Sequence, residues 1–175
     1  MNRKKYQDSI RNMVTAAVFA SLILVLTAFV HIPTHQGYVH VGDGLIYLAA
    51  AVLPAPYAIA ASAIGAGLSD YISGYAVYVL PTVIIKSLTA AIFSSKGNKI
   101  LTRRNLIVLI PAALICVGGY YAAGAAIDIL SGTPFEASLI AALADIPTNI
   151  IQSVLSSILF IILAAALDKL KFKKS

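Results

Sequence analysis

The chain alternates between long apolar stretches and short polar segments. Runs without a formal charge cover residues 13–30, 105–127 and 146–167. Each run is close to the roughly 20 residues with which an apolar helix spans a bilayer. The pattern therefore predicts an all-α integral membrane protein.

Shorter apolar segments between these runs raise the number of predicted helices to six. The predicted helices cover approximately residues 10–30, 43–53, 57–69, 81–94, 105–127 and 138–170. The second and third are short and are separated by two prolines, which favour a sharp reversal of the chain. Pro147 is expected to break the last helix. We expect these helices to form a single transmembrane bundle, residues 1–175.

The basic residues predict the orientation of this bundle. Twelve of the 13 lie in three clusters, which are residues 3–11, 96–104 and 169–174. Because basic loops stay on the cytoplasmic side, these clusters place both termini in the cytoplasm. An even number of crossings between clusters is required, and six helices satisfy that requirement. We expect a multi-pass protein of the cytoplasmic membrane.

Composition and missing motifs limit the function. Only 11% of the residues are charged, against about 25% in an ordinary soluble domain. The segregated basic clusters do not favour nucleic-acid binding. No G-x-x-x-x-G-K-[ST], H-E-x-x-H or G-x-S-x-G motif occurs, so we expect no nucleotide cofactor in this chain and no enzyme.

Polar residues near the predicted outer ends of the helices are the candidates for a binding site. Lys86 lies about one and a half turns inside a helix that begins near Pro81, on the same face as Thr82. An ionisable residue at that depth is expected to face the bundle interior or an aqueous cavity. For Asp43 we favour the role of N-cap of the second helix. Asp70 fits two roles equally well, the end of the third helix and a ligand-binding group.

The last helix carries a polar stripe that includes Asp145 and Asn149. Such a stripe faces either other helices or water. Tyrosines near the same end suit either an interfacial belt or the wall of a cavity that holds a flat polar-edged ring. Three histidines in the first outer loop, at positions 31, 35 and 40, are weak evidence for a metal site, and we expect none.

Residues 37–90 read "GYVHVGDGLIYLAAAVLPAPYAIAASAIGAGLSDYISGYAVYVLPTVIIKSLTA". This stretch resembles the substrate-binding S component of an energy-coupling factor (ECF) vitamin transporter. The segment "IPTNIIQSVL" of the last helix and Ala16-x-x-x-Ala20 of the first are similar to the same family, whose riboflavin-type and related members are the nearest group. The resemblance implies an outward vitamin pocket, a transmembrane coupling subunit reached through Ala16 and Ala20, and two cytoplasmic ATPase subunits. ATP is then used by these partner subunits.

We therefore predict binding of a small water-soluble vitamin or precursor of the pyridine or pyrimidine type, such as pyridoxine or hydroxymethylpyrimidine. Riboflavin is the alternative within the family, and a stand-alone proton-coupled transporter is the alternative outside it. A membrane enzyme lacks support because no nucleophile–base spacing is present. The predicted substrate-binding residues are His35, Asp70, Tyr75, Tyr78, Thr82, Lys86, Tyr121, Asp145 and Asn149.

Overall fold

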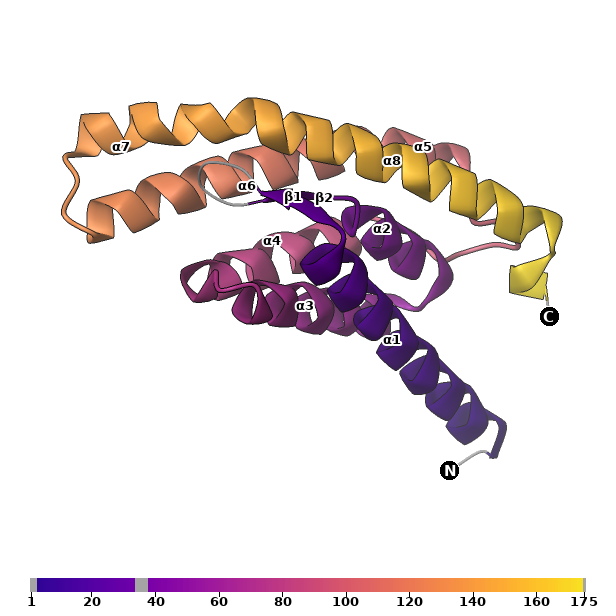
Figure 1. The fold of residues 1–175 in the computed structure, drawn as a ribbon. Helices are drawn as coiled ribbons and strands as arrows, with labels where there is room; N and C mark the ends of the chain where they lie inside the picture. The colour runs from indigo at the N-terminus through magenta and orange to yellow at the C-terminus, as the bar shows by residue number, and fades with distance from the viewer. Residues whose placement is uncertain (1–2, 34–37, 175) are drawn as a thin grey trace.

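A computed structural model describes residues 3–33 and 38–174 of the protein, which are mainly α-helical (Figure 1). The first half contains a small antiparallel hairpin, in which His31 pairs with His40, and four α-helices. In chain order these elements are α1 (Arg3–Phe29), β1 (His31–Pro33), β2 (Tyr38–His40), α2 (Asp43–Val52), α3 (Ala55–Ile72), the short 3₁₀ turn η1 (Ala76–Tyr78) and α4 (Val79–Ala91).

The second half consists of two long helical stretches. Its elements are α5 (Arg103–Ile107), α6 (Leu109–Leu130), α7 (Phe135–Ala142), η2 (Leu143–Asp145), α8 (Ile146–Lys169) and η3 (Phe172–Lys174). The break predicted near Pro147 is present, because η2 separates α7 from α8 and Pro147 occupies the first turn of α8. With α5–α6 and α7–α8 each taken as one unit, the described chain has six helical units, as predicted.

The short helix α2 is the centre of the bundle. Residues 43–51 are all buried, and α1, α3, α4 and α8 pack around them. Tyr47 stacks on Phe93 with ring centroids 5.0 Å apart, and Phe160 of α8 meets both rings edge-on. A Cβ on Gly44 would lie 2.7 Å from the Ser156 carbonyl oxygen, so only glycine lets α2 approach α8 this closely.

The third helix is longer than the sequence predicted. It covers 18 residues, which gives a length of about 27 Å, whereas the prediction began at residue 57 and ended at 69. Proline is tolerated in the first turn of a helix, so the two prolines at 54 and 56 begin α3 instead of delaying it. The chain leaves α3 through Gly74, whose φ of +87° favours glycine.

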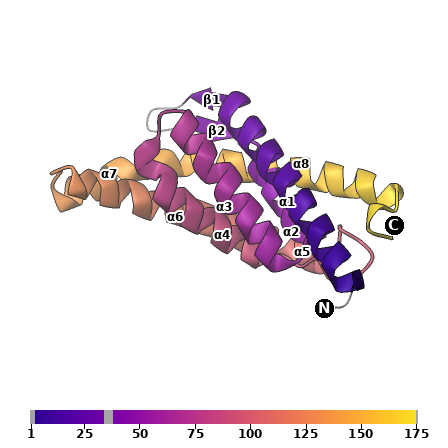
Figure 2. The same cartoon turned by 90° about the horizontal axis from the view of Figure 1, so that it is seen from below.

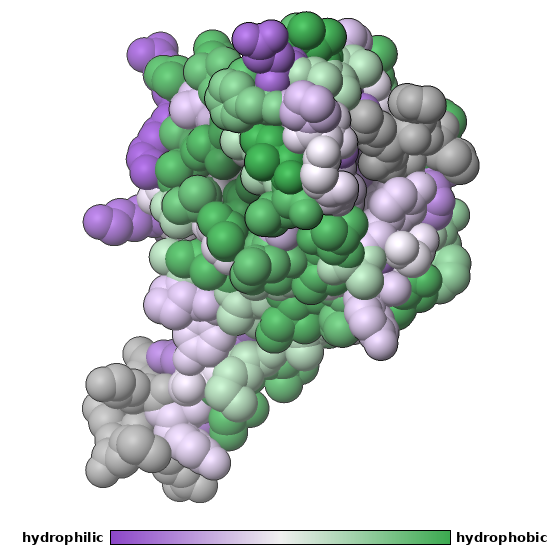
Figure 3. Space-filling view, turned by 90° about the vertical axis from the view of Figure 1, so that its left-hand side faces the viewer, coloured by the Kyte–Doolittle hydropathy of each residue, from purple (hydrophilic) through white to green (hydrophobic). Residues whose placement is uncertain are grey.

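The outer surface is apolar, as expected for a chain in lipid. Three helical stretches, Tyr6–Phe29, Arg103–Leu130 and Phe135–Lys169, are long and apolar enough to cross a membrane. Large hydrophobic side chains are exposed on α1, α4, α6 and α8. Apolar residues also cover much of the surface seen from the α7 end (Figure 3). The prediction of a helical membrane bundle is therefore confirmed.

The basic clusters gather at one end of the bundle. Both termini and α5 lie at this end in two perpendicular views, whereas α7 and the α3–α4 connection lie towards the other (Figures 1 and 2). The arrangement agrees with an even number of crossings between the clusters. Which end faces the cytoplasm stays a prediction.

Candidate functional site

A polar cavity of about 70 Å³ is lined by residues of the hairpin and of the α3–α4 connection. That connection lies away from the end where the basic clusters gather (Figure 1). The cavity is enclosed by the hairpin, the end of α3, the α3–α4 connection, α6 and the beginning of α8. The residues that line it are Tyr38, His40, Asp70, Tyr75, Tyr78, Tyr120, Asp145, Thr148, Asn149 and Gln152.

The hairpin contributes two side chains, Tyr38 and His40, to the wall of this cavity. The Tyr38 hydroxyl donates to Asp70 Oδ1 at 2.5 Å, and its ring lies 4.6 Å from that of His31 and 5.1 Å from that of Tyr75, measured between centroids. Burial, with the neighbouring Asp70 carboxylate, raises the pKa of Tyr38 well above its ordinary value, so Tyr38 stays a donor.

The hydrogen bonds of His40 fix the tautomer of its ring. Its Nδ1 accepts a hydrogen bond from the Gly42 backbone N–H at 3.1 Å, so the proton of the neutral ring lies on Nε2. Burial lowers the pKa of His40 to about 4, against an ordinary value of 6.5. His40 is therefore neutral at physiological pH and has an N–H donor at Nε2.

A buried ion pair lies beside the cavity and joins α2 to α4. Lys86 Nζ is 2.8 Å from both carboxylate oxygens of Asp43, and both side chains are 1% exposed. Gln152 of α8 donates to Asp43 Oδ2 at 3.1 Å, and Cys116 Sγ of α6 is 3.6 Å from Lys86 Nζ. Four helices therefore meet at this pair. Two buried charges are stable only when they are paired and hydrogen-bonded in this way.

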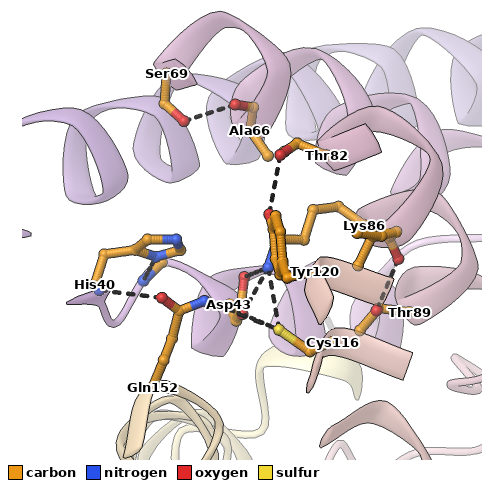
Figure 4. A network of polar contacts seen from close by, with 12 residues as sticks. His40, Asp43, Ala66, Ser69, Thr82, Lys86, Thr89, Cys116, Tyr120 and Gln152 are labelled. Carbon is orange, nitrogen blue, oxygen red and sulfur yellow. Dashed lines mark hydrogen bonds and ion pairs between the residues drawn. The ribbon is translucent and has the colours of Figure 1, made fainter. Parts of the chain in front are cut away.

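Tyr120 connects the ion pair to the cavity (Figure 4). Lys86 Nζ lies 4.9 Å from the centroid of the Tyr120 ring, a cation–π distance. Thr82, on the same face of α4 as Lys86, makes a 3.0 Å hydrogen bond with the Tyr120 hydroxyl. These two α4 residues hold the ring that lines the cavity.

Five of the predicted substrate-binding residues line the cavity: Asp70, Tyr75, Tyr78, Asp145 and Asn149. Thr82 and Lys86 are not among its lining residues. They are buried and contact Tyr120, which lines it. Their position makes them positioning residues for the wall, and their effect on substrate binding stays a prediction.

Of the two remaining predicted residues, only Tyr121 is among the residues that the structure describes. Tyr121 does not line the cavity, because on α6 its neighbour Tyr120 is the tyrosine that does. Adjacent residues on a helix point about 100° apart, and the apolar pattern around these two tyrosines does not distinguish between them. His35 lies outside the described residues.

Asp43 was wrongly favoured as a helix N-cap. The cap position is Gly42, which has no side chain, and Asp43 is the first residue of α2 and pairs with Lys86. Tyr38, His40, Thr148 and Gln152 line the cavity but were absent from the predicted site. The spacing of Thr148 and Gln152, four residues apart, could have indicated a shared helix face with Asp145.

The two alanines of the first helix contact the chain's own core. Ala16 is 9% exposed, and Ala20 packs against the same apolar cluster. A Cβ on Gly65 of α3 would fall 2.6 Å from the Ala20 carbonyl oxygen, so α1 and α3 lie very close here. The alanines therefore serve the packing of α1 on α3, and a coupling role for them stays a prediction.

The arrangement suits recognition of a flat polar molecule. Four tyrosines and a histidine offer ring faces, while two carboxylates, a threonine, an asparagine and a glutamine offer polar edges. None of the described residues that line the cavity is Lys or Arg. The cavity therefore favours a neutral or cationic molecule over an anion.

Comparison with known families decides the class of the protein. The family model of the S component of ECF-type riboflavin transporters matches residues 7–169. The chain belongs to this family. The match extends over all six helical units, so the resemblance predicted from the sequence is confirmed. No protein with a curated description matches the chain.

Membership makes this S component a membrane transport protein of the vitamin-uptake class. The family implies a small vitamin as substrate and association with the membrane and ATPase subunits of an ECF transporter. It also implies a non-enzymatic role for the chain.

Proposed function

We propose that this S component binds a one-ring heteroaromatic vitamin or precursor, of the pyridine or pyrimidine type, in the polar cavity. The observation that carries the proposal is the set of lining groups, which combines tyrosine rings with the carboxylates of Asp70 and Asp145. Pyridoxine and hydroxymethylpyrimidine carry hydroxyl or amino donors at the ring edge. Those donors suit carboxylate acceptors, and the ring suits stacking on tyrosine.

The His40 tautomer supports a ligand with a ring nitrogen. Gly42 N–H donates to Nδ1 of the His40 ring, so the other ring nitrogen, Nε2, carries the N–H and is free of this bond. His40 lines the cavity, so this N–H is a candidate donor to a ligand. A pyridine or pyrimidine nitrogen is a hydrogen-bond acceptor. One side of the ligand is then recognised by a donor and the other by carboxylates, which gives it a defined orientation.

The size of the cavity also supports a small ring. Its volume of about 70 Å³ is well below the roughly 300–1,000 Å³ of pockets that enclose drug-sized ligands. A three-ring flavin with its ribityl chain requires more rearrangement of the hairpin and the α3–α4 connection than a single ring. Ordering those segments lowers the affinity for the larger ligand.

Riboflavin is the second candidate, because the matching family model is that of riboflavin transporters. We further propose that the basic end of the bundle faces the cytoplasm, that both termini are therefore inside, and that partner ATPases supply the energy for uptake. The separation of the basic clusters from the polar cavity supports this orientation.

The test is identification of the ligand by mass spectrometry of small molecules that copurify with the protein. It is followed by calorimetric titration of the ligand-free protein with pyridoxine, hydroxymethylpyrimidine and riboflavin. We expect saturable binding of a one-ring vitamin, weakened at least tenfold by Asp70→Asn. Preferential binding of riboflavin would favour the second candidate. Binding of none of the three, with no copurified vitamin, would refute both.

Transport is tested separately in liposomes. The S component alone should bind vitamin without accumulating it, whereas accumulation should require ATP and the partner subunits. Accumulation by the purified chain, driven by a proton gradient, would instead show a stand-alone transporter.

A further inference from the structure

Besides the polar cavity, the bundle has a groove at the end where the basic clusters gather. None of the residues that line this groove lines the polar cavity. The groove has a volume of about 670 Å³. It lies between the α2–α3 connection, the end of α4 and the beginning of α5. The lining residues are Ala50, Pro54, Ala55, Ala90, Phe93, Ser94, Ser95, Lys96, Thr102 and Arg104.

The floor of the groove is apolar and its rim is cationic. Ala50, Ala90 and Phe93 are buried side chains of the bundle core. Lys96 and Arg104 are exposed, and they are the charged residues among those that line the groove. Charged groups beside an apolar floor are typical of sites for molecules that carry both a charge and a hydrocarbon part.

Among the described residues, no acidic side chain forms an ion pair with Lys96 or Arg104 at this rim. The ion pair found among residues 3–33 and 38–174 is that of Lys86 with Asp43, at the other site. Asp168, the acidic residue that approaches this loop, accepts from the backbone N–H groups of Ile100 and Leu101 at 2.8 and 2.9 Å. An anion in the groove would therefore meet two cations without a competing carboxylate contact.

The loop that carries the rim has a fixed shape. Asn105, fully buried, donates through Nδ2 to the carbonyl oxygens of Ser94 and Ile100 and accepts from the Ser94 N–H. Arg104 Nη2 donates to the Ile92 carbonyl oxygen at 2.9 Å, which holds the guanidinium beside the end of α4. The loop backbone and the Arg104 guanidinium are thus preorganised, which lowers the entropic cost of binding an anion.

We propose that this groove binds the headgroup of an anionic phospholipid. The phosphate contacts Lys96 and Arg104, and the hydrocarbon part begins over the apolar floor. A lipid is favoured over a free phosphate because apolar side chains form the floor of the groove. The groove also lies at the ends of helices that expose large hydrophobic side chains, as surfaces in contact with lipid do. Basic pockets between membrane helices are known to bind anionic headgroups.

Native mass spectrometry of the detergent-purified protein tests the proposal, with phosphatidylglycerol and phosphatidylcholine added at equal concentration. We expect preferential retention of phosphatidylglycerol, by about fivefold or more. The double variant Lys96→Gln/Arg104→Gln should lose this preference. The control Lys99→Gln/Arg103→Gln removes the same charge from the same loop outside the groove, and it should keep the preference within twofold.

Arg104→Gln also removes a hydrogen bond to the backbone, so Lys96→Glu serves as a second variant that leaves Arg104 in place. We expect it to lower phosphatidylglycerol retention at least fivefold, while vitamin binding at the polar cavity stays unchanged.

Equal losses in the groove and control double variants would overturn the proposal, because they would show attraction to the whole basic end. Competition by soluble glycerol phosphate as effective as that by the lipid would overturn it in favour of a free-phosphate site. Unchanged lipid retention, with loss of the partner subunits on copurification, would overturn it in favour of a protein-docking surface.

Discussion

Replacement of Lys86 by methionine tests the central polar contact of the bundle. Methionine keeps much of the length of the lysine side chain and removes its charge. Asp43, 1% exposed, then keeps the Gln152 amide at 3.1 Å as a donor but loses its cation. A buried carboxylate without a counter-charge is strongly unfavourable, so Lys86→Met should destabilise the folded bundle.

Two independent routes give the same magnitude for this loss. Removing one partner of a buried pair costs about 3–5 kcal/mol. Alternatively, the variant avoids the buried charge when Asp43 takes up a proton, which at pH 7 costs about 4 kcal/mol for a carboxyl group of reference pKa about 3.9. We therefore expect a loss of about 4 kcal/mol in the free energy of unfolding.

The assay is unfolding in mixed micelles of increasing dodecyl sulfate content, followed by far-ultraviolet circular dichroism. Asp43→Asn and the double variant complete a double-mutant cycle, in which the double variant should be destabilised by less than the sum of the single variants. Thr89→Val, a buried change one turn further along α4, is the control and should cost about 1 kcal/mol.

A loss below 1 kcal/mol for Lys86→Met, or strict additivity in the cycle, would refute the view that the pair holds α2 against α4. Vitamin affinity is a second readout. Lys86 contacts the ring of Tyr120 rather than the cavity, so Lys86→Met should weaken binding through displacement of that ring. Unchanged affinity would restrict Lys86 to a role in stability.

Three further predictions concern single positions. Gly44→Ala should destabilise the bundle by about 1–3 kcal/mol because its Cβ meets the α8 backbone, whereas Gly118→Ala in α6, with nothing within 4 Å, should be neutral or stabilising in the same micelle unfolding assay. Tyr38→Phe should weaken vitamin binding in calorimetry by about tenfold, since it removes the donor that orients Asp70, and an affinity within twofold of wild type would contradict this role. His40 has a folded-state pKa of about 4 and an ordinary value of 6.5, so its stabilisation is present above pH 6.5 and is lost as the pH falls towards 4, by up to about 3 kcal/mol. His40→Asn should therefore flatten the decline of the melting temperature between pH 6.5 and 4.5, and an unchanged decline would contradict the assignment.

The helices of this protein could be predicted because each signal is local. A run of about 20 uncharged residues specifies a helix in lipid wherever it occurs, since backbone groups must be satisfied within the segment. The break before Pro147 also follows from local sterics. The extent of α3 was missed, because the same prolines that end one helix can occupy the first turn of the next.

The site was predicted only in part, because its residues come from segments far apart in the sequence. Polar residues near the ends of apolar helices identified Asp70 and Asp145 as candidates. The hairpin residues Tyr38 and His40 lie in the same outer loop as His35, which was predicted, but the sequence of this loop did not single them out. Their place in the cavity wall depends on how the hairpin packs beside α3 and α8.

By itself, the sequence determined that the chain is a six-helix membrane bundle of the S component family, with twelve of its basic residues in three clusters and one lysine inside an apolar stretch. Only the tertiary structure decided what that lysine does. It pairs with Asp43, 43 positions away, because burying one charge requires an opposite charge, and the packing of α2 against α4 determines which carboxylate is available. The packing of α6 against α4 and α8 likewise selects Tyr120 over Tyr121 for the cavity, since the neighbours of a helix set its rotation about its axis.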